Sequence, residues 1–127
     1  MTTTGIGIDL VDVDRFRRLL ERRPRILERL FTDGERRDAH DRPERLAARF
    51  AAKEATLKTL GVGVGEAPWR SIEVTLNEAG APSLVLHDRA QELARAQGIR
   101  YLHVSLSHTD HLAAAFVVGS SFEESSG

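Results

Sequence analysis

One long helix is the element that most constrains what this chain can fold into. The sequence Asp41-Arg-Pro-Glu44 places a capping residue before a proline at the first helical position, with a glutamate three residues after the cap. This pattern predicts a helix that runs to about Leu60 and ends at Gly61, a residue typical of a C-terminal cap. The whole chain has 127 residues, which is the size of one domain.

Short strands and helices are expected on both sides of the long helix. Before it, Gly5–Val11 alternates like a strand, Asp12 or Asp14 caps a helix that Pro24 interrupts, and Thr32 opens a capping box. After it come a hairpin (SIEVTLN and PSLVLH), a helix capped by Asp88, and two strands (RYLHVSLSH and LAAAFVV). This order predicts an α+β domain over residues 1–119, with a small antiparallel sheet packed against the long helix and a flexible tail over 120–127.

The composition excludes several classes of protein. The chain has no cysteine, so disulfides, thiolate catalysis and cysteine-bound metals are excluded, and a cytoplasmic location is expected. It has neither the apolar run of about 18 residues that a membrane span needs nor the pattern of a signal peptide. The net charge of −1, with no aromatic residues interleaved among the basic ones, argues against nucleic-acid binding.

Glu54 is out of place on the long helix. It shares one face with Leu46, Phe50 and Leu57, because positions four apart are offset by only about 40°. A carboxylate in an apolar stripe is costly unless it is paired or bound to a metal. Two alternatives remain from the pattern alone: Glu54 is a functional carboxylate, or it leans out and pairs with Lys58 one turn later.

Asp9 raises the same question in the first strand, where aspartate is disfavoured. One alternative is that it caps the helix that follows. A hard cation would explain both carboxylates, because Mg²⁺ typically takes one or two protein carboxylates together with water and substrate phosphates.

Basic residues and glycines surround Glu54 in the sequence. The basic residues follow three- and four-residue steps, at Arg42, Arg45, Arg49 and Lys53. They form either a wall that binds an anion, which Lys58 also reaches, or a solvated basic face. The glycines of the loop 61–65 either let the backbone approach a phosphate or simply end the helix.

Two further segments carry candidate binding residues. Residues 15–31 hold seven arginines and two glutamates, with Arg15, Arg18, Arg22, Arg25 and Arg29 forming one stripe if Pro24 does not break it. The stripe fits an acidic partner, although plain solubility is an alternative. Near the C-terminus, Ser107-His108 lacks the surroundings of a nucleophile pair, and an imidazole beside a phosphate is the fairer interpretation. The roles of Asp110 and His111 stay open.

Three segments together resemble a known family. GIGIDLVDVDRF, RFAAKEATLKTLGVGVG and VSLSHTDHLAAAFV are similar, in order and spacing, to the motifs of holo-acyl-carrier-protein synthases, the small single-domain type of 4′-phosphopantetheinyl transferase. The resemblance implies the fold of that family. It also implies transfer of 4′-phosphopantetheine from coenzyme A to a serine of an acidic apo acyl carrier protein, releasing adenosine 3′,5′-bisphosphate. The alternative is a non-catalytic module that binds coenzyme A or the carrier.

The resemblance also implies roles for single residues. Mg²⁺, or alternatively Mn²⁺, is expected on Asp9 and Glu54, which act in catalysis with Lys58; Glu54 is the first candidate for the general base and Asp9 the second. Coenzyme A contacts are expected from Arg49, Lys53, Lys58, Gly61, Gly63, Gly65 and His108. Carrier docking is expected from Arg15, Arg18, Arg22 and Arg25. The family further implies a homotrimer with interfacial sites and a place in fatty acid biosynthesis, whereas the class of carrier and the tolerance for acyl-coenzyme A stay open.

Overall fold

The first and the last described strands, β1 and β5, lie side by side in one sheet. The computed structural model describes residues 3–121, in which the three-stranded sheet has the antiparallel order β1-β5-β4 and a separate hairpin pairs β2 with β3. In chain order the elements are β1 (Thr3–Asp12), α1 (Val13–Arg22), α2 (Ile26–Leu30), α3 (Asp33–Ala39), α4 (Pro43–Thr59), a 3₁₀ turn (Trp69–Ser71), β2 (Ile72–Leu76), β3 (Pro82–Leu86), α5 (Asp88–Ala96), β4 (Tyr101–His108) and β5 (Leu112–Ser120).

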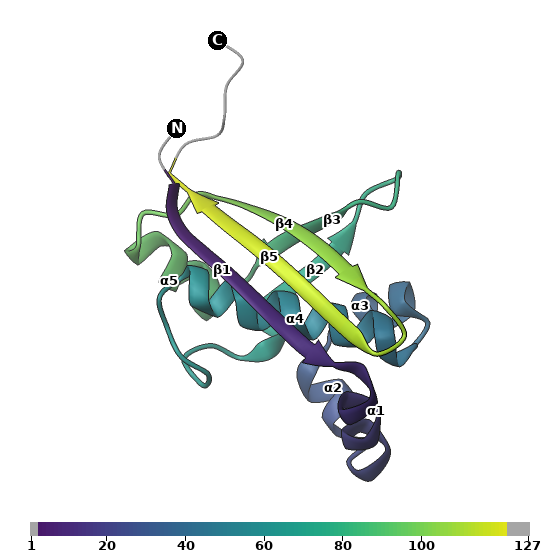
Figure 1. The fold of residues 1–127 in the computed structure, drawn as a ribbon. Coiled ribbons are helices and arrows are strands. Elements are labelled where there is room, and N and C mark those ends of the chain that lie inside the picture. Colours follow the sequence, from purple (N-terminus) through teal and green to yellow (C-terminus); the bar gives the residue numbers. More distant parts are fainter. Residues whose placement is uncertain (1–2, 122–127) are drawn as a thin grey trace.

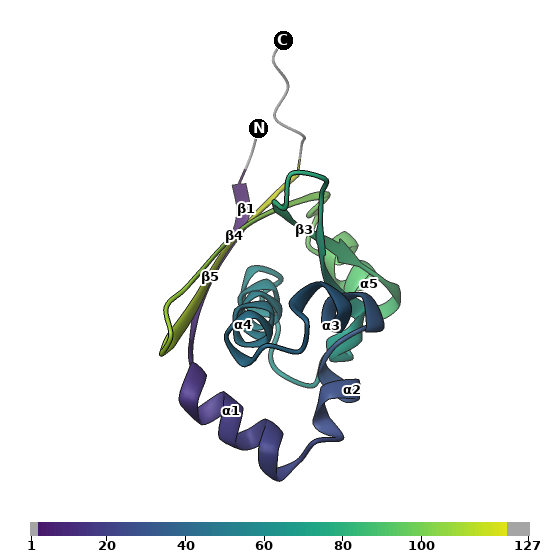
Figure 2. The ribbon, with the colours of Figure 1, turned by 90° about the vertical axis from the view of Figure 1, so that its right-hand side faces the viewer.

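The long helix α4 lies at the centre of the molecule. The three-stranded sheet covers one side of α4 (Figure 1), and the view turned by 90° shows β3, α3 and α5 on its other side, with α1 below (Figure 2). Most side chains of α4 are buried, including Leu46, Leu57 and a series of alanines. The predicted α+β domain, with a small antiparallel sheet on a long helix, is confirmed.

Small residues let the sheet lie close to α4. Ala51, Ala52 and Ala55 of the helix are buried against Ala115 and Val117 of β5. The inner face of β1 carries Gly5, Gly7, Asp9 and Val11, whereas its larger apolar side chains point away from the helix. These outward side chains are exposed by 60% at Ile6, 58% at Ile8 and 62% at Leu10.

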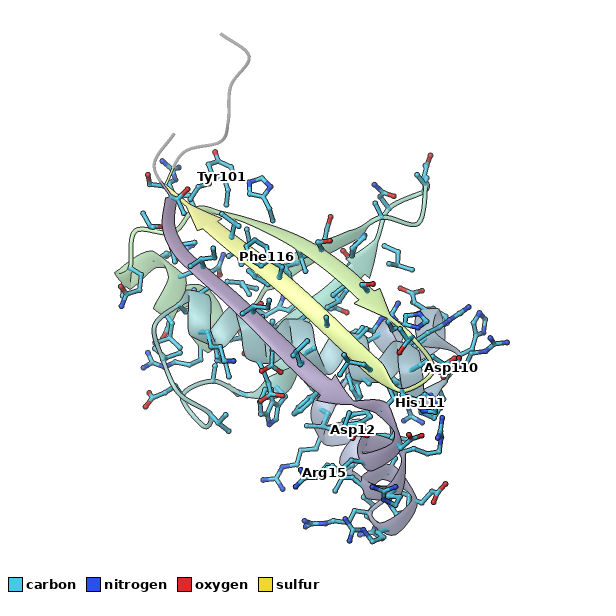
Figure 3. The ribbon with its side chains drawn as sticks, in the orientation of Figure 1. Asp12, Arg15, Tyr101, Asp110, His111 and Phe116 are labelled. Atoms are coloured by element: carbon cyan, nitrogen blue, oxygen red, sulfur yellow. The ribbon has the colours of Figure 1, made fainter. Side chains whose placement is uncertain are left out.

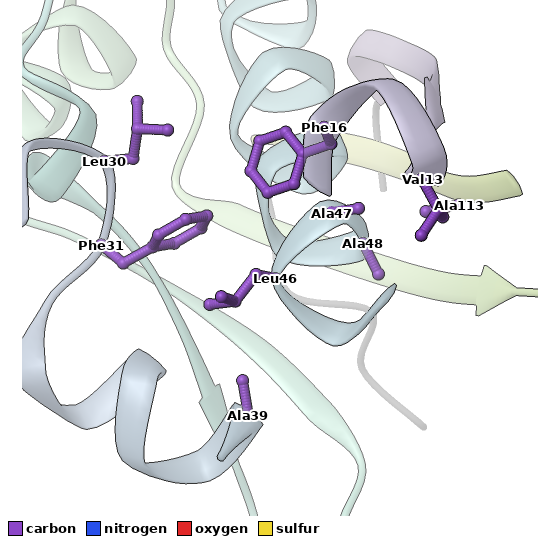
Figure 4. Packing of buried hydrophobic residues seen from close by; sticks show 9 residues of the cluster. All are labelled: Val13, Phe16, Leu30, Phe31, Ala39, Leu46, Ala47, Ala48 and Ala113. Atoms are coloured by element: carbon purple, nitrogen blue, oxygen red, sulfur yellow. The ribbon is translucent and has the colours of Figure 1, made fainter. Parts of the chain in front are cut away.

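A second part of the core joins α1, α2 and α3 to the first half of α4. Phe16, Phe31, Leu30 and Leu46 are buried together there with several alanines (Figure 4). The rings of Phe16 and Phe31 meet edge to face with centroids 6.3 Å apart. This packing fixes α1 beside the start of the sheet.

The helix boundaries confirm part of the predicted capping. Asp12 caps α1 by accepting a hydrogen bond of 2.9 Å from the Arg15 amide, and Thr32 and Glu35 form the predicted capping box of α3. The predicted caps at Asp41 and Asp88 are wrong. Arg42 precedes Pro43 at the start of α4, and His87 is the residue before α5. Asp41 instead has a positive φ of 51° and pairs with Arg36.

The ends of the chain add two observations. β5 runs to Ser120, one residue past the predicted domain end, and most of the predicted tail lies outside the described residues. Between residues 3 and 121, no helix is long and apolar enough to cross a membrane.

Candidate active site

Asp9 lies where β1 passes the second half of α4. The Lys58 ammonium donates to the Asp9 Oδ1 at 3.0 Å and to the main-chain oxygen of Ile8 at 2.9 Å. The other Asp9 oxygen, Oδ2, is buried and has no hydrogen-bond partner. Asp9 therefore does not cap α1, and its Oδ2 has no hydrogen-bond donor beside it among the described residues.

Glu54 is the second carboxylate at this place. Its partial burial, followed by the like charge of Asp9, raises the pKa of Glu54 to about 7, and the Lys58 ammonium opposes the rise. The two carboxylates, one from β1 and one from α4, are thus close enough to repel each other. The alternative in which Glu54 is merely the i+4 partner of Lys58 does not describe this arrangement, because Lys58 donates its hydrogen bonds to Ile8 and Asp9 of β1.

The Asp9–Glu54 pair suits a hard cation. Its donors are carboxylate oxygens, one of which is buried without a partner, and a cation between them would remove their repulsion. Over residues 3–121 there is no cluster of three or more His, Asp or Glu side chains that could hold a metal. A cation here would need further ligands from water and substrate, as is usual for Mg²⁺.

A groove of about 650 Å³ begins at Glu54 and follows α1. Its walls combine apolar side chains of β1, α1 and α4 with Asp12 and with two arginines, Arg15 and Arg22, which lie two helix turns apart on α1. Asp12 and Arg15 lie at the point where β1 passes into α1 (Figure 3). The groove therefore combines apolar surface with two positive charges and one negative charge, and it ends at Glu54.

The predicted arginine stripe is broken in the middle. Pro24 separates α1 from α2, so Arg15, Arg18 and Arg22 lie on one helix and Arg25 immediately precedes the next. All four are exposed, but only Arg15 and Arg22 line the groove.

A second hollow, of about 280 Å³, lies beside the first half of α4. Arg45, Arg49 and His108 line it together with the β2–β3 turn. Arg49 is 5% exposed, burial lowers the pKa of its guanidinium, and its Nε is buried without a hydrogen-bond partner. Asp38 lines the same hollow, so two arginines and an imidazole are opposed there by one carboxylate, and the remaining excess of positive charge suits an anion such as a phosphate.

The two hollows lie on opposite sides of α4. Arg45 and Glu54 are nine residues apart, which at 100° per residue turns them about 180° from each other. His108 ends β4 at one edge of the sheet, whereas Asp9 lies on β1 at the other edge. The hypothesis of one continuous basic wall beside Glu54 is therefore wrong within a single chain.

Lys53 is corrected from a ligand contact to a core residue. Its side chain is fully buried, and the ammonium donates to the Glu35 carboxylate at 2.8 Å and to the main-chain oxygens of Trp69 and Ile72. The other Glu35 oxygen accepts from the Val74 amide at 2.9 Å. With three acceptors and no exposed surface, Lys53 cannot reach coenzyme A; it ties α4 to α3 and β2.

Removing Lys53 should therefore affect stability rather than ligand binding. We expect Lys53→Met to lower the free energy of unfolding by about 3–5 kcal/mol, because Glu35 would remain buried without its cation. Urea denaturation measures this, and the double variant Lys53→Met/Glu35→Gln should recover part of the loss. An unfolding free energy equal to that of the wild type would contradict the pairing.

The glycine loop starts as a helix cap. Gly61 has a positive φ of 72°, its amide donates to the Lys58 oxygen, and the Val62 amide donates to the Leu57 oxygen, which is a Schellman arrangement. A Cβ at Gly63 or Gly65 would meet nothing within 4 Å. The structure thus confirms the cap at Gly61, while the predicted approach of the loop to a ligand stays a prediction.

The loop between β4 and β5 holds the two residues whose role was open. His111 Nδ1 lies 2.9 Å from an oxygen of Asp14, and its main-chain oxygen accepts from the Val13 amide. The hydrogen bond to His111 lowers the pKa of Asp14. The loop that follows His108 is thereby tied to the start of α1 (Figure 3 labels Asp110 and His111).

Comparison with known proteins gives one consistent family. Residues 5–117 match the 4′-phosphopantetheinyl transferase superfamily. The holo-[acyl-carrier-protein] synthase of Moorella thermoacetica is 48% identical over 93% of this chain and 95% of its own. The crystal structure of holo-[acyl-carrier-protein] synthase from Neisseria meningitidis has a TM-score of 0.84 at 30% identity, covering 94% of this chain and 99% of that one. The Helicobacter pylori enzyme in complex with coenzyme A has a TM-score of 0.82 at 33% identity, covering 91% and 99%.

Proposed function

Because the chain belongs to the 4′-phosphopantetheinyl transferase superfamily and transfers 4′-phosphopantetheine from coenzyme A to an apo acyl carrier protein, we propose that Asp9, Glu54 and Lys58 carry out this transfer. The observation that carries the assignment is the neighbouring pair of carboxylates, in which Glu54 lines the end of the groove and Asp9 has a buried oxygen without a hydrogen-bond partner. In the reaction the serine oxygen of the carrier attacks the β-phosphorus of coenzyme A. The bond to the bridging oxygen breaks, and adenosine 3′,5′-bisphosphate leaves.

Asp9 and Glu54 are the residues that would hold Mg²⁺, or alternatively Mn²⁺. When bound, such an ion supplies positive charge that stabilises the negative charge developing on the pyrophosphate. The chain offers two carboxylates here, so the phosphate oxygens of the substrate are expected to complete the site.

Lys58 is the residue proposed to hold the pyrophosphate. Its ammonium has three N–H donors, and two of them go to Asp9 and to the main-chain oxygen of Ile8. The side chain is 56% exposed, so the third donor is available to a phosphate oxygen. The Gly61–Gly65 loop follows directly and would let the backbone lie against the same ligand.

Glu54 is the proposed general base. It lies at the end of the groove that leads along α1, where the serine of a docked carrier would arrive. A carboxylate in hydrogen-bond reach of that hydroxyl, directly or through one water, accepts its proton as the oxygen attacks. Asp9 is the second candidate, but its Oδ1 is already held by Lys58.

We propose that a complete site combines two copies of the chain. Glu54, with Lys58 one turn later and bound to Asp9, lies on one side of α4, whereas Arg49 and His108 line a hollow on the other, so the two groups do not form one site on a single copy. The outward face of the three-stranded sheet supplies the surface for assembly. Ile8 of β1 lies opposite Phe116 of β5, and Phe116 is 41% exposed on the face turned away from α4 (Figure 3). A homotrimer in which this face is covered is the proposed assembly.

The carrier is proposed to dock in the groove along α1. Carrier proteins with an acidic helix would pair with Arg15 and Arg22 in the groove and with Arg18 and Arg25 beside it. Complementary charge of this kind mainly raises the rate of encounter and fixes orientation.

Reversing one groove arginine should therefore weaken use of the carrier alone. We expect Arg15→Glu or Arg22→Glu to raise the apparent KM for the carrier about five- to tenfold, with little change in the KM for coenzyme A. Added salt should raise the wild-type KM for the carrier, since screening limits charge reach to about 8–10 Å. Arg95→Glu, on the exposed side of α5, is the matched control and should behave like the wild type. Equal changes in both KM values would contradict docking at α1.

Mass spectrometry tests the function as a whole. Candidate apo carriers from fatty acid, polyketide and peptide synthesis are incubated with the protein, coenzyme A and Mg²⁺. We propose a cytoplasmic role in fatty acid biosynthesis, so the fatty acid carrier should gain the mass of phosphopantetheine fastest. Binding of coenzyme A without any mass gain on a carrier would instead favour the non-catalytic module.

A further inference from the structure

Gly5 and Gly7 mark the places where β1 touches the backbone of α4. A Cβ added at Gly7 would lie 2.1 Å from the main-chain oxygen of Ala55 and 2.7 Å from the Thr59 hydroxyl. A Cβ added at Gly5 would lie 2.2 Å from the main-chain oxygen of Thr59. Neither glycine has a positive φ, so neither is required by the backbone conformation of the strand. Both are required by the closeness of strand and helix.

The contact at Gly7 is next to the two carboxylates. Side chains alternate along a strand, so Gly7 and Asp9 face α4 together, about 7 Å apart. On the helix, Glu54 is the residue directly before Ala55. The depth at which Gly7 meets Ala55 therefore sets how far Asp9 lies from Glu54.

We propose, resting on the assignment of Asp9 and Glu54 above, that Gly7 is a positioning residue that fixes the spacing of this carboxylate pair for a divalent cation. An alanine at this position would collide with a helix carbonyl, which cannot rotate away because it belongs to the backbone. Normal contact would require the strand to retreat by about 1 Å, and a displacement of that size at a catalytic group is enough to cost about 100-fold.

Gly5 provides a matched control on the same strand. An alanine there meets an equally close helix carbonyl, but Gly5 lies four residues from Asp9, about 13 Å along the strand. The two substitutions impose nearly the same steric conflict and differ in their distance from the carboxylates. A purely structural role of the glycines predicts equal effects, whereas positioning predicts unequal ones.

The test compares Gly7→Ala and Gly5→Ala with the wild type. Urea denaturation first measures stability, where we expect similar losses. Mn²⁺ binding is then followed by electron paramagnetic resonance on the protein with coenzyme A and no carrier, so that no turnover occurs. We expect Gly7→Ala to weaken Mn²⁺ binding at least tenfold and Gly5→Ala to change it less than threefold. The Mg²⁺ concentration for half-maximal turnover should shift in the same way.

The outcomes separate this inference from the assignment on which it rests. Wild-type affinity for Mn²⁺ in Gly7→Ala, or equal losses in both variants, would overturn the positioning role. Mn²⁺ binding that survives in Asp9→Asn would overturn the metal assignment itself. If Gly7→Ala does not fold, the double variant Gly7→Ala/Thr59→Ala is compared with Thr59→Ala. Both lack the Thr59 hydroxyl, so they differ only in the contact between the added Cβ and the Ala55 carbonyl. A tenfold loss of Mn²⁺ affinity between these two variants is again the criterion.

Discussion

Replacing Asp9 with asparagine, or Glu54 with glutamine, should lower turnover by at least ~100-fold at saturating coenzyme A and carrier, the usual scale for loss of one electrostatic catalytic element. Each substitution keeps the shape of the side chain and removes its negative charge. The negative charge is what each carboxylate would contribute to binding a cation. Asp9 Oδ2 has no hydrogen-bond partner in the described part of the protein, so we expect it to be a ligand of that cation. Initial rates of carrier modification, measured over a range of Mg²⁺ concentrations, give the size of the loss.

Glu44→Gln is the matched control for this experiment. Glu44 lies in the first turn of the same helix, ten residues and about 15 Å along the axis from Glu54, and its replacement should leave turnover within twofold of the wild type. Near-normal turnover of either Asp9→Asn or Glu54→Gln at high Mg²⁺ would show that the metal assignment is wrong. A parallel loss of stability would be seen as a lower midpoint in urea, and neither substitution is expected to cause one.

The second large effect is expected from Phe116→Lys. In the proposed assembly this side chain is covered by a neighbouring copy, and burial of an unpaired ammonium costs several kcal/mol. Since each 1.4 kcal/mol is a factor of ten, association should weaken by more than ~100-fold and activity at micromolar concentration should fall with it. Analytical ultracentrifugation gives the mass of the assembly, and the carrier assay gives the activity of the same samples.

Val85→Lys controls for the cost of a lysine on an exposed strand. Val85 is 39% exposed on β3, which belongs to the other sheet, and its cross-strand neighbour is Glu73, so a lysine there is tolerated. We expect an intact assembly with full activity. A wild-type protein that is monomeric and fully active at micromolar concentration would contradict the shared site and leave the metal assignment untouched.

The two carboxylates of the proposed site stand out in the sequence because each breaks a pattern. Glu54 interrupts an apolar helix face and Asp9 interrupts an apolar strand, and such exceptions are visible without coordinates. Lys53 shows the limit of the same reasoning. Its spacing from Arg49 predicted that both side chains lie on one surface, but Lys53 points into the core and pairs with Glu35. The sequence alone does not distinguish a buried lysine from an exposed one.

The sequence pattern also could not predict which face of β1 points toward the interior. Alternation of large apolar with small residues normally places the large ones inside. Here the glycines face the interior, because α4 lies too close for a side chain, and Ile6, Ile8 and Leu10 face outward. Only the separation of strand and helix decides between the two arrangements. The same holds for the distribution of basic residues between the two hollows, which depends on what α4 packs against on each side.

The placement of the two hollows on opposite sides of α4 bears on how many complete sites an assembly of several copies would contain. In the proposed homotrimer, a copy that completes one site with its Glu54 side presents its His108 side to its other neighbour, which is a head-to-tail contact that closes into a ring. In such a ring the number of complete sites equals the number of copies, and an isolated copy has none. Damage to His108 in one copy removes one site and spares the others. In this proposed ring each copy would contribute to two sites, with its carboxylates in one and its proposed phosphate-binding side chains in the next.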